Sequence, residues 1–156
     1  MTTATKQKAR NTPSVEKKQM FPTPGDSLGL KINDLIDSAA QIRSGLSFNK
    51  LADFQRTSQL PMDVIAKMVK LSKRTMVRRK KSRKLSQDES ERLVRLSLVF
   101  EQATNLFDGD KAAAREWLSQ PSKALGQIPP LVIAETDMGA RAVERLIGQL
   151  EHGVFP

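Results

Sequence analysis

Two helical patterns meet at Ser72 with almost no chain between them, and this junction constrains the fold more than any other sequence feature. Pro61 suits the first turn of the upstream helix because that position needs no N–H. Apolar residues then follow at helical spacing, at Val64, Ile65, Met68 and Leu71. Ser72 can cap a second helix that begins at Lys73. Two helices joined by so tight a turn are typical of a helix-turn-helix motif.

The rest of the chain also carries helical periodicity, and no stretch alternates as a strand would. We expect five further helices, at about 31–44, 47–58, 86–107, 110–118 and 136–150. Ser86 and Glu89 form a capping box at the start of the longest helix, which we expect to be the central scaffold. Pro129 and Pro130 predict an irregular connector before the last helix. The predicted fold class is all-α, with about seven helices.

The chain of 156 residues has room for one ordinary domain or two small ones that share a core. Residues 1–25 lack periodicity and are rich in Lys, Thr and Pro, so we expect a flexible basic arm there. We assign residues 26–107 to a helix-turn-helix domain with its long connecting helix. Residues 108–156 then form a small helical C-terminal domain.

The positive charge of the chain is concentrated in two places. The net charge is +9, but residues 67–84 alone carry +10 and contain no acid, residues 1–25 carry +4, and residues 108–156 carry −2. A run of charge is often only a solvated helix face. This run lacks the acids that would relieve its self-repulsion, so an external polyanion such as phosphate backbone is the natural counter-charge. Two surfaces with two partners are therefore expected.

The basic run fills the second helix of the pair, which is the element that enters the major groove in helix-turn-helix proteins. We therefore expect binding to double-stranded DNA through seven residues, Ser72, Lys73, Arg74, Thr75, Arg78, Arg79 and Lys81. Arginine matches guanine edges with two hydrogen bonds, whereas Ser and Thr suit phosphate or mixed contacts. RNA is the competing ligand, but the chain has no Tyr and one Trp, so stacking platforms are missing.

Little in the sequence favours an enzyme. The chain has no Cys, and His152 is its single histidine. It also has no glycine-rich phosphate loop and no nucleophile elbow. We expect no catalytic residues, no metal and no cofactor, and we expect Trp117 and the Phe residues to belong to the core. No apolar stretch reaches the roughly 20 residues of a membrane helix or resembles a secretory signal, which predicts a cytoplasmic protein without membrane contact.

The C-terminal stretch is the most specific part of the sequence. It contains four distinctive segments, Trp117 to Gly126 (WLSQPSKALG), Pro129 to Leu131 (PPL), Glu135 to Val143 (ETDMGARAV) and Gly153 to Phe155 (GVF). In order and spacing, these segments resemble the toxin-binding domain of Xre/MbcA/ParS antitoxins. The turn Ser72-Lys73-Arg74-Thr75 and the helix start at residues 85–90 (LSQDES) are similar to the Xre/Cro-like helix-turn-helix half of that family. The resemblance covers roughly residues 45–156.

The resemblance implies an antitoxin of a type II toxin-antitoxin system. Its partner would be a RES-type toxin that depletes cellular NAD, and residues 108–156 would be a toxin-binding and dimerisation domain. The antitoxin would also repress its own operon. The alternative is a free-standing helix-turn-helix regulator whose C-terminal domain only dimerises. Since one chain offers a single recognition helix, we expect a homodimer with operator half-sites about 34 Å apart, inside a larger toxin-antitoxin hetero-oligomer.

The short tail after the last helix suggests how the toxin is inhibited. Phe155 is apolar and lies one residue from the end of the sequence, so something should cover it. We hypothesise that the tail and the outward face of the last helix plug the toxin's NAD cleft, through Arg141, Glu144, Arg145, Glu151, Val154, Phe155 and Pro156. The alternative is that Val154 and Phe155 fold back onto the protein's own core.

Overall fold

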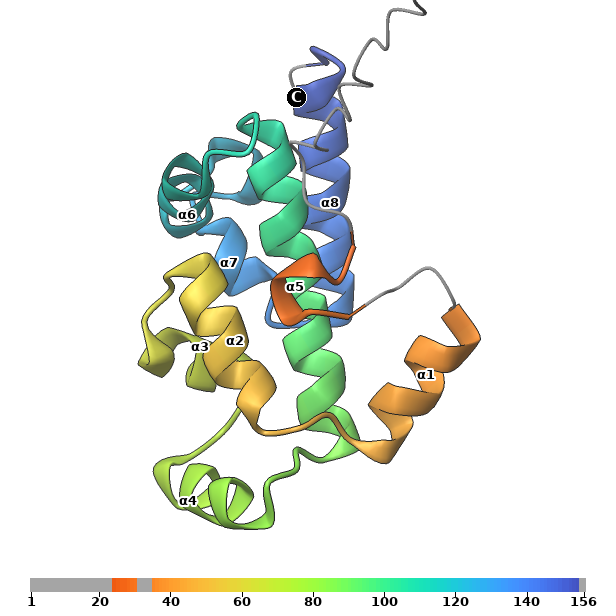
Figure 1. The fold of residues 1–156 in the computed structure, drawn as a ribbon. Coiled ribbons are helices and arrows are strands. Elements are labelled where there is room, and N and C mark those ends of the chain that lie inside the picture. Colours follow the sequence, from red (N-terminus) through yellow and green to blue (C-terminus); the bar gives the residue numbers. More distant parts are fainter. Residues whose placement is uncertain (1–23, 31–34, 155–156) are drawn as a thin grey trace, which may run out of the picture.

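The computed structural model describes residues 24–30 and 35–154, and every regular element in these ranges is helical. The elements are η1 (Asp26–Leu28), α1 (Leu35–Ser44), α2 (Asn49–Ser58), α3 (Met62–Val69), α4 (Lys73–Ser82), α5 (Gln87–Leu106), α6 (Lys111–Ser119), η2 (Lys123–Leu125), α7 (Pro130–Ile133) and α8 (Asp137–Glu151) (Figure 1). The predicted all-α class is confirmed. The predicted helix start at residues 31–34 lies outside the described residues.

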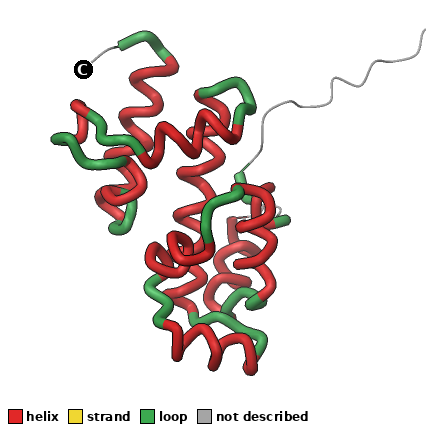
Figure 2. Tube along the Cα trace, turned by 90° about the vertical axis from the view of Figure 1, so that its left-hand side faces the viewer, coloured by secondary structure: helices red, strands yellow, loops and turns green. Residues whose placement is uncertain are grey.

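Helix α5 is the scaffold of the molecule, as its length and its capping box predicted. The Ser86 side chain accepts a hydrogen bond from the Glu89 amide, and the Glu89 side chain accepts one from the Ser86 amide. The buried stripe of α5 packs against helices from both halves of the chain, which group along its two ends (Figures 1 and 2). On the N-terminal side, Phe54 of α2 meets Phe100 edge to face, with ring centroids 5.9 Å apart. One hydrophobic core therefore runs through both groups of helices.

The segment before α1 is fastened to the middle of α5. The amides of Gly25 and Ser27 donate to the Glu101 carboxylate at 2.8 and 2.9 Å, and the Ser27 hydroxyl donates to it as well. Leu28 is fully buried beside them. Gly25, the last residue of the expected flexible arm, is itself buried, and residues 1–23 lie outside the described residues. Three donors around one carboxylate were not visible in the sequence because the partners are far apart in the chain.

Glu101 is buried, with only 3% of the residue exposed. Burial raises its pKa above the ordinary value, because removing a carboxylate from water disfavours its charged form. The hydrogen bonds from Ser27 and Gly25 lower the pKa again but do not outweigh burial. The folded state therefore holds a proton on Glu101 more tightly than the unfolded chain does.

The structure differs from the prediction at one additional short helix and at the start of α2. The connector at Pro129 contains the short helix α7, in which Pro130 takes the first position, where its fixed φ fits. This turn is the element missing from the predicted seven helices. Helix α2 begins at Asn49 and not at about residue 47. Ser47 pairs with Lys84 in an isolated antiparallel bridge, and its hydroxyl accepts a hydrogen bond of 3.4 Å from the Asn49 amide. Such long-range pairing leaves no local signal in the sequence.

Candidate nucleic-acid interface and partner surface

The turn before α4 fixes the direction of this helix. Lys70 adopts a left-handed conformation with φ of 60°, and its amide donates to the Lys67 carbonyl at 3.1 Å. Ser72 then caps α4, accepting a hydrogen bond from the Thr75 amide at 3.1 Å. The Ser72 and Thr75 hydroxyls also lie 2.9 Å apart. The predicted cap and tight turn are confirmed, and both hydroxyls support the helix start.

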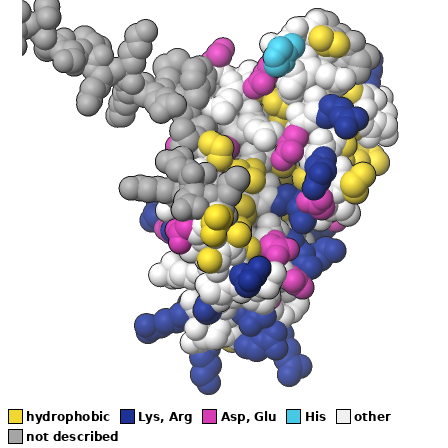
Figure 3. Space-filling view, turned by 90° about the vertical axis from the view of Figure 1, so that its right-hand side faces the viewer, with side chains coloured by type: hydrophobic (Ala, Val, Ile, Leu, Met, Phe, Trp, Pro, Cys, Tyr) yellow, Lys and Arg dark blue, Asp and Glu magenta, His cyan; other side chains and the backbone are white. Residues whose placement is uncertain are grey.

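Helix α4 has one face toward the protein and one face toward solvent. Thr75, Met76 and Arg79 are half-buried on the inner face, where Met76 packs against the core. The outer face is exposed and carries Lys73, Arg74, Val77, Arg78 and Lys81. Figure 3 shows Lys and Arg side chains gathered at the end of the molecule that α4 forms. Five of the seven predicted DNA-binding residues are therefore exposed: Ser72, Lys73, Arg74, Arg78 and Lys81.

Arg79 differs from its neighbours because its side chain forms an ion pair within the protein. Its Nε donates to both carboxylate oxygens of Glu89, at 2.8 and 3.1 Å, and the Glu89 side chain is only 8% exposed. Burial alone would raise the pKa of Glu89, but the Ser86 amide and the Arg79 guanidinium more than offset it, and the pKa lies below its ordinary value. The pair ties α4 to the start of α5.

The far end of α4 is held by a backbone clasp, which we define as the pairing of residues 46–48 with residues 83–85. The Phe48 amide donates to the Arg83 carbonyl at 3.0 Å, and the Leu85 amide donates to the Leu46 carbonyl at 2.9 Å. Gly45 permits this approach, since a Cβ there would lie 2.2 Å from the Leu85 carbonyl oxygen. The clasp fixes where the last turn of α4 points.

A cavity of about 470 Å³ opens beside this clasp. It is lined by Ser47, Phe48, Asn49, Lys80 and Arg83. Within the described ranges, neither Lys80 nor Arg83 forms an ion pair with an acid, in contrast to Arg79. Lys80 and Arg83 extend the basic surface beyond the predicted residues. The basic run contains both, but only the clasp reveals that they line one cavity with residues from α2.

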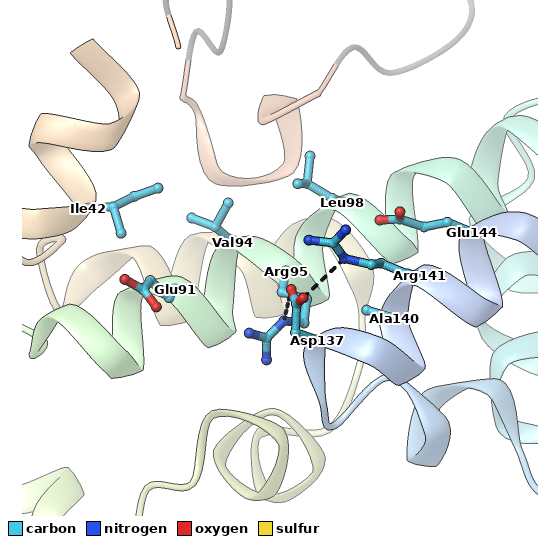
Figure 4. A pocket seen from close by; sticks show the side chains of 9 residues that line it. All are labelled: Ile42, Glu91, Val94, Arg95, Leu98, Asp137, Ala140, Arg141 and Glu144. Atoms are coloured by element: carbon cyan, nitrogen blue, oxygen red, sulfur yellow. Dashed lines mark hydrogen bonds and ion pairs between the residues drawn. The ribbon is translucent and has the colours of Figure 1, made fainter. Parts of the chain in front are cut away.

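The outward face of α8 begins at a groove between three helices. A pocket of about 430 Å³ is lined by apolar side chains of α1, α5 and α8 and by charged groups around them (Figure 4). Asp137 lies among these groups, bonded to Arg141 at 3.1 Å and 3.8 Å from Arg95. Two predicted toxin-binding residues, Arg141 and Glu144, line this pocket.

The other predicted toxin-binding residues lie farther along α8. Arg145 and Glu151 are exposed on it. Val154 is 56% exposed just after the helix, with its amide bonded to the Gln149 carbonyl at 2.8 Å. Val154 therefore does not fold back onto the core. The predicted contacts at Phe155 and Pro156 lie outside the described residues.

The start of α8 fits tightly against α7. Thr136 caps α8 by accepting a hydrogen bond from the Gly139 amide at 3.0 Å. A Cβ at Gly139 would lie 1.7 Å from the Ile133 carbonyl oxygen, so only glycine fits this crossing. Trp117 of α6 is half-buried against Phe107, with ring centroids 6.3 Å apart, as a core residue should be. These contacts fix the outward face of α8 relative to the core.

Among the described residues, no group of three His, Cys, Asp or Glu side chains could hold a metal ion. No helix in the same ranges is long and apolar enough to span a membrane.

Comparisons with known proteins agree with this division into two helical groups. Residues 37–97 match the antitoxin Xre-like helix-turn-helix domain, and residues 102–153 match the antitoxin Xre/MbcA/ParS C-terminal toxin-binding domain. An "Antitoxin Xre" of Yersinia enterocolitica is 37% identical over 122 residues, which cover 78% of this chain and 80% of the relative. The chain belongs to the Xre antitoxin family. It is thus an antitoxin with a helix-turn-helix domain and a toxin-binding domain, and its partner is a toxin.

Two further relatives are similar to this chain. An "Antitoxin Xre" of Photorhabdus laumondii is 41% identical over 71 residues, which cover 46% of this chain and 48% of the relative. A "Prs ADP-ribosylating antitoxin" of a Sphingobium species is 26% identical over 164 residues, which cover 99% of this chain and 96% of the relative. The two matched domains adjoin inside α5, so one continuous helix joins them.

Proposed function

We propose that this antitoxin represses its own operon by binding operator DNA through α4 while its C-terminal domain holds a RES-type toxin that depletes NAD. The observation that carries the proposal is the placement of the two surfaces. The exposed, acid-free face of α4 and the C-terminal end of α8 lie at opposite ends of the molecule (Figure 1). DNA and toxin can therefore be bound at the same time.

The contacts to DNA divide by chemistry. Arg74 and Arg78 are exposed and reach base edges in the major groove, where each good pair discriminates by about 1–3 kcal/mol. Ser72, Lys73 and Lys81 contact phosphates, joined by Lys80 and Arg83 at the cavity beside the clasp. Thr75 supports the cap of α4, and Arg79 positions α4 through Glu89. In this proposal residues 26–107 form the DNA-binding domain.

The antitoxin acts as a homodimer within a larger complex with the toxin. Each chain offers one recognition helix, and two are needed to read half-sites about 34 Å apart. Residues 108–156 supply the toxin-binding and dimerisation surfaces in this proposal. The complex forms in the cytoplasm.

Inhibition works by occupancy and requires no catalysis by the antitoxin. The outward face of α8 (Arg141, Glu144, Arg145 and Glu151) docks on the toxin, and the tail Val154, Phe155 and Pro156 enters its NAD cleft. The exposure of Val154 supports this role, because an apolar side chain outside the core is available to a partner. The name of the Sphingobium relative, "Prs ADP-ribosylating antitoxin", is compatible with ADP-ribosylation chemistry in the toxin.

Co-expression with the product of the neighbouring reading frame tests the proposal. The two proteins should co-purify, cellular NAD should fall when the neighbour is expressed alone, and the antitoxin should restore it. The purified antitoxin should also bind its promoter fragment as a dimer, measured by gel shift and light scattering. Promoter binding without any effect on NAD would favour the alternative, a free-standing regulator with a dimerisation domain.

A further inference from the structure

Val77 is an apolar side chain in the middle of a cationic surface. It is 71% exposed on the outer face of α4, between Lys73, Arg74, Arg78 and Lys81. The preceding residue, Met76, points the other way and packs against the core. Met76 and Val77 are the only Val, Leu, Ile, Met or aromatic residues of α4, and of the two only Met76 packs against the core.

The folded structure gives no reason for valine at this position. Valine is β-branched and is a weaker helix former than Lys, Arg or Gln, so local stability favours another residue. Its side chain is mostly exposed, and α4 contains no buried residue at all. Its short, stiff side chain is surrounded by longer ones that reach to phosphates and base edges.

The major groove of DNA offers one apolar group on a base edge, the 5-methyl of thymine. A short apolar side chain at the centre of a helix that enters the groove is complementary to that group, while flanking cations hold the helix close to the backbone. We propose that Val77 contacts a thymine methyl group and selects thymine at one position of each operator half-site. This inference rests on the proposed function, because α4 must enter the major groove.

Replacing thymine by deoxyuridine tests the contact, since the two bases differ only by the methyl group. A duplex is first enriched from a random pool by the full-length protein. Each thymine of one half-site is then replaced singly by deoxyuridine. We expect the wild-type protein to lose affinity about fourfold at one position, the effect of a buried methyl-sized group. V77A should bind the thymine duplex correspondingly more weakly and show no further loss with deoxyuridine.

Ile36→Ala is the matched control, because Ile36 is also exposed but lies on α1, outside α4 and outside the proposed dimerisation domain. This variant should retain both the affinity and the deoxyuridine effect. The inference is overturned if the wild-type protein is indifferent to every deoxyuridine or if V77A still discriminates. A wild-type protein that enriches no duplex overturns the DNA-binding proposal itself, so the two failures are distinguishable.

Discussion

The Nε of Arg79 lies 2.8 Å from a carboxylate oxygen of Glu89, and this pair connects α4 to the first turn of α5. The same carboxylate accepts the Ser86 amide at 2.7 Å, so the group that completes the cap of α5 also holds α4. The start of the central helix and the orientation of the proposed recognition helix therefore depend on one side chain. We therefore expect mutations of this pair to affect both folding and the proposed DNA binding.

Arg78 and Arg79 are adjacent in the chain but should respond differently to alanine substitution. R78A should lower operator affinity by about 1–3 kcal/mol if it reads a base, with little change in stability, because Arg78 is exposed. R79A should also lower stability, by about 1–3 kcal/mol, since it leaves Glu89 largely buried without its partner. Thermal unfolding and DNA titration of both variants measure this. Equal stability of the two variants would contradict the role of Arg79.

Glu101 should make stability fall as pH rises through its folded-state pKa. Its raised pKa means that the native state binds the proton more tightly than the unfolded chain, in which the value is near 4.3. The stabilisation from Glu101 is therefore fully present below the unfolded-state pKa and is lost as pH rises above the folded-state pKa. Denaturant unfolding at several pH values should show E101Q gaining on the wild type from pH 4.5 to pH 7.

E89Q provides a control of opposite sign for this experiment. The pKa of Glu89 is lowered in the folded state. The stabilisation from Glu89 is therefore present above its unfolded-state pKa and is lost as pH falls through its folded-state pKa. The wild type should be more stable than E89Q at neutral pH and should lose this advantage in acid. A pH-independent difference for either variant would show that the corresponding pKa is the same in both states.

Gly139 should tolerate no side chain. Alanine there would place a Cβ 1.7 Å from a backbone oxygen of α7, so α8 must shift, and toxin binding should be lost along with stability. Gly148 lies on the same helix with open space around its Cβ position. Gly148→Ala should stabilise α8 by about 0.5–1 kcal/mol, because alanine is a better helix former than glycine. Thermal unfolding and co-purification of the two variants make the comparison.

Removing the tail should separate the two activities. A chain that ends at Leu150 should fold and bind DNA, because its last core residues, Leu146 and Ile147, remain. It should fail to protect cells from the toxin if the tail fills the NAD cleft. Growth after toxin induction and a gel shift measure the two activities. Full protection by the truncated chain would assign inhibition to the outward face of α8 alone.

Lys80 and Arg83 should contribute to the binding of any DNA sequence. Replacing both with Gln should weaken binding to operator and to random duplex by similar factors, since phosphates carry no sequence information. The slope of log affinity against log salt concentration should become shallower by about one for each phosphate contact that is lost. The double variant with Lys111→Gln and Lys123→Gln, which removes two exposed charges from the C-terminal domain, is the charge-matched control. A loss confined to the operator would mean that these residues read bases.

Local signals predicted most of this structure. Ser72, Ser86 and Asp110 cap the helices that the sequence places after them, and Pro61 lies directly before the first turn of α3. The missed features depend on residues distant in sequence. The sequence predicts a helix from about residue 47, yet Ser47 pairs with Lys84 and α2 begins at Asn49. Arg79 belongs to the basic run by sequence, and only the tertiary fold brings Glu89 to it.

The contacts of Gly25 and Ser27 with Glu101 bear on how this protein can be divided. Glu101 falls between the two matched family domains, and its partners precede both of them. A fragment limited to either matched domain would contain neither the carboxylate nor its donors, and a cut after residue 97 would leave the donors and the carboxylate on different pieces. The two halves are therefore not interchangeable cassettes, and a hybrid antitoxin that combines domains of two relatives must inherit this segment and the middle of α5 from the same parent.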